Sequence, residues 1–146
     1  MSSRTASASW EPGPLRCDVA VEGFTISVDE PEVAGGTGLA PQPTDFFLAS
    51  AASCFTLALI HNAAKRSIAL TMLRVDAIGH YSGRRFDAVR LVVAAVGPTS
   101  DQLPALIEAA QRDCYVTNTV RVGAQVSVSL EAGISPTSGV SPVALK

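Results

Sequence analysis

The hydrophobic pattern of the chain is dominated by one uninterrupted apolar stretch, residues 43–66. No charged side chain lies between Asp45 and Lys65, and the stretch is rich in Ala and Leu, which favour a helix. Thr44 can cap the first turn, and Asp45 suits the positive end of the helix dipole. Because apolar side chains occur on every face, the sequence predicts a helix that is buried on all sides.

A membrane span is the alternative for this stretch, because a span needs about 20 apolar residues. The stretch, however, carries His61 and Asn62, whose polar side chains are costly in hydrocarbon. The segments on both sides alternate between apolar and polar residues, as the strands of a water-soluble sheet do. We therefore expect the central helix of a globular core, and no membrane partner.

Alternating runs on either side of the central stretch predict two hairpins. In the first, residues 16–21 and 24–29 flank the turn Glu22-Gly23. In the second, residues 70–81 and 86–96 flank the turn at residues 82–85. Both patterns are typical of paired antiparallel strands.

The remaining elements complete an α+β pattern. A second helix is predicted over residues 100–113, with Pro104 in its first turn, where proline is tolerated. Residues 124–131 alternate and predict a last strand. Hairpins with inserted helices are typical of an antiparallel α+β domain rather than of a doubly wound parallel sheet.

The length of 146 residues suits one domain with a sizeable core. Residues 1–14 are Ser-rich and end in Glu-Pro-Gly-Pro, and we interpret them as a flexible tail in which only Trp10 packs. Residues 15–131 form the predicted single domain. The turn-rich residues 132–146 are expected to be a loose C-terminal tail.

Composition narrows the function classes. The chain is 47% hydrophobic and only 16% charged, a balance that favours an oligomer interface hiding part of the apolar surface. A net charge of -2 gives no electrostatic footprint for nucleic acid. The N-terminus lacks the apolar segment of a secretory signal, so we expect a cytoplasmic protein.

Three cysteines, Cys17, Cys54 and Cys114, carry the candidate chemistry. Their number is odd, and their spacing is not that of a zinc site or of a disulfide scaffold. With two distant histidines, they predict neither a metal site nor a cofactor. Cys54 lies in the middle of the central helix, where a thiol is usually a small hydrophobic side chain. Cys17 is expected to be structural.

Three segments, taken together and in order, resemble the OsmC/Ohr family of small thiol-dependent hydroperoxide reductases. The run 24–45, with D-E-P, G-G and P-T-D, is similar to the family's approach to its central helix. The run L-A-S-A-A-S-C matches the small residues before the family's peroxidatic cysteine. The run C-Y-V-T-N-T-V resembles the segment around its resolving cysteine. The resemblance covers residues 10–131.

The resemblance implies roles for two of the cysteines. Cys54 would be the peroxidatic thiol and Cys114 the resolving thiol of an intertwined homodimer, in which hairpin sheets wrap the central helices. The chain departs from the family pattern at two positions. Asp45 stands where the family often has Glu, and Tyr115 follows the second cysteine where Pro is usual.

A thiolate at Cys54 needs help from outside its own helix. The helix dipole acts only within about the first turn, and burial raises the pKa of a thiol. The resemblance points to Arg16 as the activating cation, with Asp45 orienting it. Asp45 and Cys54 lie ~13 Å apart along a straight helix, so Asp45 could equally serve only to complement the helix dipole. Arg16 could likewise be an exposed edge-strand side chain.

The predicted activity is the reduction of organic hydroperoxides, with an external dithiol restoring both cysteines. An apolar pocket around Phe46, Phe47 and Phe55 would favour organic substrates over hydrogen peroxide. Two other functions remain open on the same fold: a binding module for a small apolar ligand, and a thiol-based redox sensor. His61 is too far along the helix to pair with Cys54, and we expect it to be buried and hydrogen-bonded.

Overall fold

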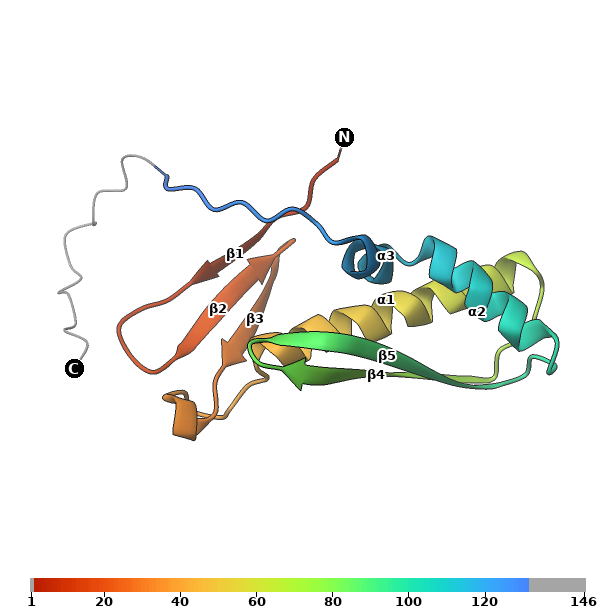
Figure 1. The fold of residues 1–146 in the computed structure, drawn as a ribbon, viewed down its shortest axis with the longest axis horizontal. Coiled ribbons are helices and arrows are strands. Elements are labelled where there is room, and N and C mark those ends of the chain that lie inside the picture. The colour runs from red at the N-terminus through yellow and green to blue at the C-terminus, as the bar shows by residue number, and fades with distance from the viewer. Residues whose placement is uncertain (1, 132–146) are drawn as a thin grey trace. The chain divides into compact units, whose positions relative to one another are not determined.

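The computed structural model describes residues 2–131, which form two compact units. The first unit contains residues 2–43 and 126–131, and the second contains residues 44–125. The predicted boundaries of a single domain at residues 15–131 stay a prediction, and the predicted C-terminal tail lies outside the described residues. The predicted α+β class, with antiparallel strands, is confirmed (Figure 1).

The first unit is built on a three-stranded antiparallel sheet in the order β1-β2-β3. Strands β2 (Arg16–Val21) and β3 (Phe24–Asp29) form the first predicted hairpin. Its turn uses Glu22 and Gly23, both with positive φ, as a tight hairpin requires. The expectation that residues 1–14 lack structure is wrong for β1 (Ala6–Ser9), which pairs with β2.

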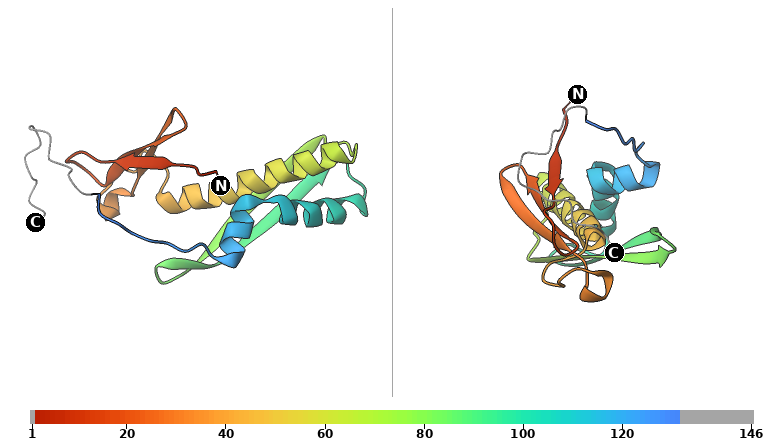
Figure 2. Two further views of the ribbon diagram at one scale, coloured as in Figure 1. Left: turned by 90° about the horizontal axis from the view of Figure 1, so that it is seen from above. Right: turned by 90° about the vertical axis from the view of Figure 1, so that its left-hand side faces the viewer.

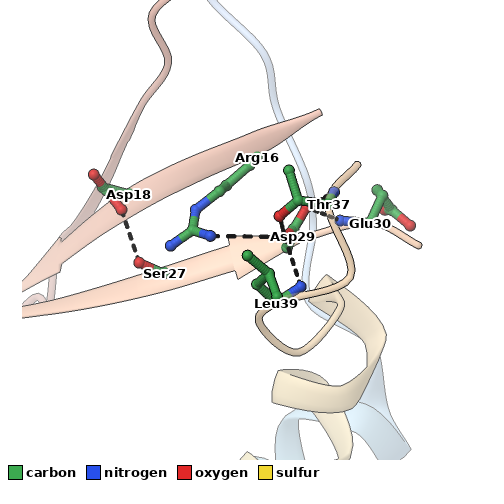
Figure 3. Close-up of polar contacts among 7 residues, drawn as sticks. All are labelled: Arg16, Asp18, Ser27, Asp29, Glu30, Thr37 and Leu39. Carbon is green, nitrogen blue, oxygen red and sulfur yellow. Dashed lines mark hydrogen bonds and ion pairs between the residues drawn. The ribbon is translucent and has the colours of Figure 1, made fainter. Parts of the chain in front are cut away.

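Asp29, at the end of β3, fixes the loop that leads to the central helix. Its side chain is 1% exposed, and each of the two carboxylate oxygens accepts two hydrogen bonds (Figure 3). The donors are the backbone N–H groups of Glu30, Thr37 and Leu39 and the Thr37 hydroxyl. These bonds, the Thr37 hydroxyl first, lower the pKa of Asp29 to about 2. The loop, which includes the short 3-10 helix η1 (Glu32–Ala34), is thus wrapped around one carboxylate.

The second unit packs a long helix against a hairpin and a second helix. Helix α1 (Pro43–Lys65) matches the predicted central helix, and β4 (Met72–Ser82) and β5 (Arg85–Val96) match the second hairpin. Helix α2 (Gln102–Asp113) follows, and the hairpin runs along α1 (Figure 1). The core joins Phe55, Leu59 and Leu106 to apolar side chains of β4 and β5.

Two helix starts differ in detail from the prediction. Helix α1 begins at Pro43, so Thr44 lies inside the first turn, where its hydroxyl accepts a hydrogen bond from Tyr81. Helix α2 is preceded by a reciprocal capping pair. The Thr99 hydroxyl accepts from the Gln102 N–H, and the Gln102 side chain accepts from the Thr99 N–H. This pair satisfies two backbone donors at the helix start.

Helix α1 is not buried on all sides, contrary to the prediction. In the single chain, its buried residues follow one face only, because α2 and the β4–β5 hairpin cover only that side. The buried residues are Ala51, Phe55, Ala58, Leu59, Asn62 and Ala63. On other faces Leu57 is 66% exposed and Ile60 is 46% exposed.

At the C-terminal end one prediction is wrong and one element was not predicted. Residues 124–131 form no strand, because no described strand pairs with them. Instead, an additional short helix, α3 (Tyr115–Val122), directly follows Cys114. Its sequence is rich in β-branched residues, so its helical form depends on contacts with α2 rather than on propensity.

Helix α1 is the one helix within residues 2–131 that is long and apolar enough to cross a membrane. That criterion concerns length and composition alone. The face of α1 that packs in the core of the second unit agrees with the interpretation of a core helix.

The Asp29 site predicts an acid-dependent loss of stability. Its pKa is about 2 in the folded chain against an ordinary 3.8, so the ionised carboxylate stabilises the fold above about pH 4, and this contribution is lost as pH falls towards 2. Asp29→Asn should lower the thermal unfolding temperature at neutral pH, because an amide nitrogen cannot accept the bonds of one oxygen. The difference between the two proteins should narrow between about pH 4 and pH 2.

Thermal unfolding followed by circular dichroism at stepped pH checks this expectation. Asp18→Asn is the control, since Asp18 is an exposed carboxylate that accepts a hydrogen bond from the Ser27 hydroxyl. If the unfolding temperatures of Asp29→Asn and wild type differed by the same amount at every pH from 4 to 2, the role given to the Asp29 charge would be contradicted.

Candidate functional site

The second unit brings Cys54 and Cys114 together. Cys54 lies in the middle of α1, and Cys114 is the single residue between α2 and α3. Cys114 belongs to the core cluster and Cys54 packs against it, and each thiol affects the pKa of the other. Both are free thiols. Cys114 is 0% exposed, whereas Cys54 is partly exposed. The second unit thus places two free thiols in the same part of its core, as an intramolecular disulfide requires.

The corner between α2 and α3 is fixed by hydrogen bonds on both sides of Cys114. The Cys114 N–H donates to the Ala110 carbonyl, 2.9 Å, and the Cys114 carbonyl accepts from the Asn118 N–H, 3.0 Å. The Asn118 side chain then donates to the Arg112 carbonyl, and Arg121 donates to the Gln111 carbonyl. These bonds satisfy carbonyls at the C-terminal end of α2, and the chain turns sharply there (Figure 2).

A buried polar contact ties the same corner to α1. Asn62, 3% exposed, donates to the Asp113 carboxylate at 2.9 Å. Arg66 donates to the Asn62 side-chain oxygen at 2.7 Å. Asp113 immediately precedes Cys114, so this contact holds the end of α2, and with it the second thiol, against the helix that carries the first.

The two thiols have different electrostatic surroundings. Burial raises the pKa of Cys54, and the neighbouring Cys114 raises it further, against opposing hydrogen bonds from the backbone of Val116 and Tyr115. Burial also raises the pKa of Cys114. Hydrogen bonds from Thr117, Cys54 and Val116 outweigh this effect, so the pKa of Cys114 is lowered. Within the second unit, the negative charge is therefore better accommodated on Cys114.

A mainly apolar cavity of about 470 Å³ lies in the same unit, and neither Cys54 nor Cys114 is among the residues that line it. Phe47, Ala51 and Phe55 of α1 form one wall, and Thr117 of α3 connects the cavity to the Cys114 corner. The other lining residues come from β5, α2 and α3: Val89, Arg90, Leu91, Val93, Ile107, Gln111, Val120 and Arg121. Phe46 is partly buried and lies outside this lining set.

Arg16 lies in the first unit, at the start of β2, where it pairs with Asp29. The Arg16 guanidinium is 3.9 Å from a carboxylate oxygen of Asp29 (Figure 3). That carboxylate is already saturated by four shorter hydrogen bonds, so it orients the guanidinium without holding it tightly. Sequence reasoning missed Asp29, although it stands in the D-E-P segment. The roles given to Arg16 and Asp45 at Cys54 stay predictions.

Two other predicted environments can be compared with the structure. His61 is exposed, contrary to the expectation of a buried histidine, because α1 is covered on one face only. Cys17 is partly exposed in β2, opposite Val28. Within residues 2–131, no three His, Cys, Asp or Glu side chains are grouped to hold a metal ion.

Comparisons with known proteins agree with this geometry. Residues 36–129 match the family described as OsmC-like protein. The matched segment includes α1, both hairpin strands of the second unit and the Cys114 corner. The chain therefore belongs to the OsmC/Ohr family. No curated protein matches the chain.

Solved structures share the fold at low sequence identity. An organic hydroperoxide resistance protein OsmC from Legionella pneumophila has a TM-score of 0.62 and 24% identity, covering 83% of this chain and 90% of that one. An organic hydroperoxide resistance protein from Elizabethkingia anophelis gives 0.63 and 24%, covering 82% and 89%. An OsmC like protein from Mycoplasma pneumoniae gives 0.68 and 17%, covering 82% and 88%.

Proposed function

We propose that the protein reduces organic hydroperoxides through Cys54 and Cys114. The observation that carries the proposal is the packing of two free thiols against each other in a unit that also holds an apolar cavity. The family and the solved relatives named for hydroperoxide resistance support the same class of redox chemistry. A cytoplasmic location, where thiols are kept reduced, is part of the proposal.

The proposed cycle begins at Cys54. Its thiolate attacks the distal oxygen of the hydroperoxide, the O–O bond breaks, and the alkoxide takes up a proton to leave as an alcohol. Cys54 is then a sulfenic acid. The Cys114 thiolate attacks the Cys54 sulfur, a disulfide forms, and the hydroxyl leaves with a proton as water. An external dithiol reduces the disulfide by thiol exchange and is itself oxidised to a disulfide.

The surroundings of Cys114 suit the second step. A thiolate is the attacking species, and the hydrogen bonds from Thr117 and Val116 lower the pKa of Cys114. Because Cys114 is 0% exposed, it reacts with its neighbour Cys54 rather than with solutes. Cys54, which is partly exposed, is the thiol that substrate can reach.

The cavity suits an organic substrate. Phe47 and Phe55 line it together with aliphatic side chains of β5. Apolar surface of this kind binds the hydrocarbon part of an organic hydroperoxide by excluding water, and offers nothing comparable to hydrogen peroxide. Phe46, predicted with them, would act from outside the described cavity lining.

Replacing Cys54 tests the proposed reaction. Cys54→Ser should abolish repeated consumption of an organic hydroperoxide in the presence of dithiothreitol, because a serine hydroxyl does not form a sulfenic acid. The change in volume is small, so circular dichroism should show an intact fold. Peroxide is measured over many turnovers, with Cys17→Ser as the matched control.

The pattern of consumption separates the alternatives. The proposal expects many equivalents consumed by wild type and by Cys17→Ser, and none by Cys54→Ser. Consumption of about one equivalent by wild type would instead describe a sensor, and no consumption would describe a binding module. Sustained turnover by Cys54→Ser would overturn the assignment of the peroxidatic thiol.

Activation of Cys54 requires a cation, since burial raises the pKa of this thiol within its own unit. We assign this role to Arg16. Its guanidinium lies 3.9 Å from the Asp29 carboxylate, which leaves its other N–H groups available to a thiolate. Asp45 at the start of α1 would contribute to the orientation of the arginine. A guanidinium beside a thiolate lowers the thiol pKa by direct charge attraction.

Arg16→Met tests this assignment, because methionine keeps much of the apolar stem and deletes the cation. The peroxidase rate at neutral pH should fall by about tenfold or more, as one unit of thiol pKa is tenfold in thiolate. The loss should be largely recovered at high pH, where hydroxide deprotonates the thiol.

The pH–rate profile of Arg16→Met is compared with that of Arg4→Met. Arg4 is also in the first unit, in an exposed ion pair with Glu22. An Arg16→Met rate equal to wild type at neutral pH would remove Arg16 from the site. A loss that no pH restores would show that Arg16 shapes the fold instead of the thiol pKa.

A homodimer is part of the proposed function. Leu57, Ile60 and Ala64 form an exposed apolar stripe on α1 at helical spacing. Leaving such a stripe in water is unfavourable, and a second copy of the chain would cover it with the same surface, as in a two-fold interface.

Light scattering in dilute buffer should therefore give about twice the 15.1 kDa mass of one chain. Leu57→Glu should shift the protein towards the monomer, because it places a charge in the apolar stripe. Val33→Glu is the matched control at a 99% exposed valine in η1. A stable wild-type monomer would contradict the interface.

A further inference from the structure

Asn62 places a polar side chain in the apolar core of the second unit. It is 3% exposed, and Leu59 and Ala63, which share its face of α1, belong to the core cluster. A buried amide is costly unless all its polar atoms find partners. Leucine, which is branched at the same carbon, would bury only apolar surface here. The amide is therefore a poor choice for packing alone.

The hydrogen bonds of the Asn62 amide connect the end of α2 to the part of α1 that carries Cys54. The amide nitrogen donates to the Ala58 carbonyl and to the Asp113 carboxylate, both at 2.9 Å. The amide oxygen accepts from Arg66 at 2.7 Å, which fixes the orientation of the amide. The bond to Ala58 turns the side chain back over α1, to within about one helical turn of Cys54.

Asp113, the partner of this amide, is also unfavourable for its own helix. It is the last residue of α2, and a negative charge at the carboxyl end of a helix opposes the helix dipole. Asp113 immediately precedes Cys114. Residues that break a local rule are expected where function requires them. Two such residues, Asn62 and Asp113, meet here in one hydrogen bond beside the second thiol.

We propose that Asn62 is a positioning residue for the disulfide step, in which it holds Cys114 within reach of Cys54 through Asp113. Its meaning for catalysis rests on the proposed function of the two thiols. Groups held in an attacking geometry react far faster than groups that must find it. Without the Asn62 bond, the end of α2 is less restrained, and Cys114 spends less time in position to attack. The reactivity of Cys54 towards external reagents does not depend on this bond.

An aromatic disulfide reagent, dithiobis(nitrobenzoate), reads the two thiols separately in a parent chain that carries Cys17→Ser. The Cys54 thiolate attacks the reagent's disulfide, which releases one coloured thionitrobenzoate and leaves a mixed disulfide on Cys54. The Cys114 thiolate then attacks the Cys54 sulfur, the protein disulfide forms, and a second thionitrobenzoate leaves. The first release depends on reagent concentration, and the second does not. Cys114→Ser, which should release one equivalent, identifies the second step.

Asn62→Leu should slow the second release about tenfold or more and leave the first release within about twofold of the parent. Its thermal unfolding temperature should stay close to that of the parent. Leucine keeps the site filled with apolar atoms, and Arg66 and Asp113, which are both exposed, regain water. An unchanged second release would overturn the proposal. An equal loss in both releases would also overturn it, because that result describes a general disturbance of α1.

Asp113→Ala tests the same bond from its exposed side, and keeps the proposal open to refutation if Asn62→Leu fails to fold. It should slow the second release to a similar extent, and combining it with Asn62→Leu should add little, since both remove one contact. Glu108→Ala, which breaks an exposed ion pair of α2 with Arg112, is the control and should change neither release.

A second release at the parent's rate in Asp113→Ala, or fully additive losses in the combined variant, would overturn the proposal. A parent chain that releases only one equivalent would overturn it as well, because its second thiol would then not be in position to attack. The assay uses no peroxide, so a failure of the proposed function is seen separately, in the turnover measurement.

Discussion

The contact between α1 and the corner at Cys114 is the constraint on which the candidate site depends. Two thiols far apart in sequence meet only if α2 ends where it passes Cys54. The chain secures that ending by satisfying the last carbonyls of α2 with Asn118 and Arg121 of α3, and by holding Asp113 to Asn62. These bonds satisfy carbonyls that have no partner within the helix, so the hydrogen bonds that terminate α2 also position the second thiol.

The same corner divides charge unequally between the thiols. Burial raises the pKa of both thiols. Hydrogen bonds outweigh this effect at Cys114 but not at Cys54. Cys54 is left as the more exposed and less acidic thiol. In the proposed mechanism a cation offsets this, and Arg16, which pairs with Asp29 in the first unit, is the residue proposed for it.

The sequence predicted the elements whose pattern is strong and local. The long apolar run 43–66 and the two alternating hairpins agree with α1, β2–β3 and β4–β5. It did not predict α3, because Val and Thr favour strands and the helix depends on contacts with α2. Residues 124–131 alternate as a strand does, but alternation cannot supply a pairing partner. The half-exposed α1 has the same explanation, since composition does not tell which faces one chain can cover.

The site was predictable to a different degree. Resemblance alone paired Cys54 with Cys114, and the structure brings them into contact. Asp29 could not be found by pattern, because its importance lies in accepting bonds from Thr37 and Leu39, which become neighbours only when the loop folds. The backbone donors at Cys54 and Cys114 were equally invisible, since an N–H group is present at every residue except proline.

The lowered pKa of Cys114 also bears on how the proposed cycle closes. Hydrogen bonds that stabilise the Cys114 thiolate stabilise the reduced pair, and they lose their charged acceptor when the disulfide forms. A disulfide whose reduced form is stabilised in this way is more easily reduced. Cys114 is also the better leaving group, because a thiol of lower pKa departs faster, while Cys54 is the sulfur that a dithiol can reach. The arrangement that makes Cys114 reactive towards the sulfenic acid therefore also keeps the oxidised pair from becoming a dead end.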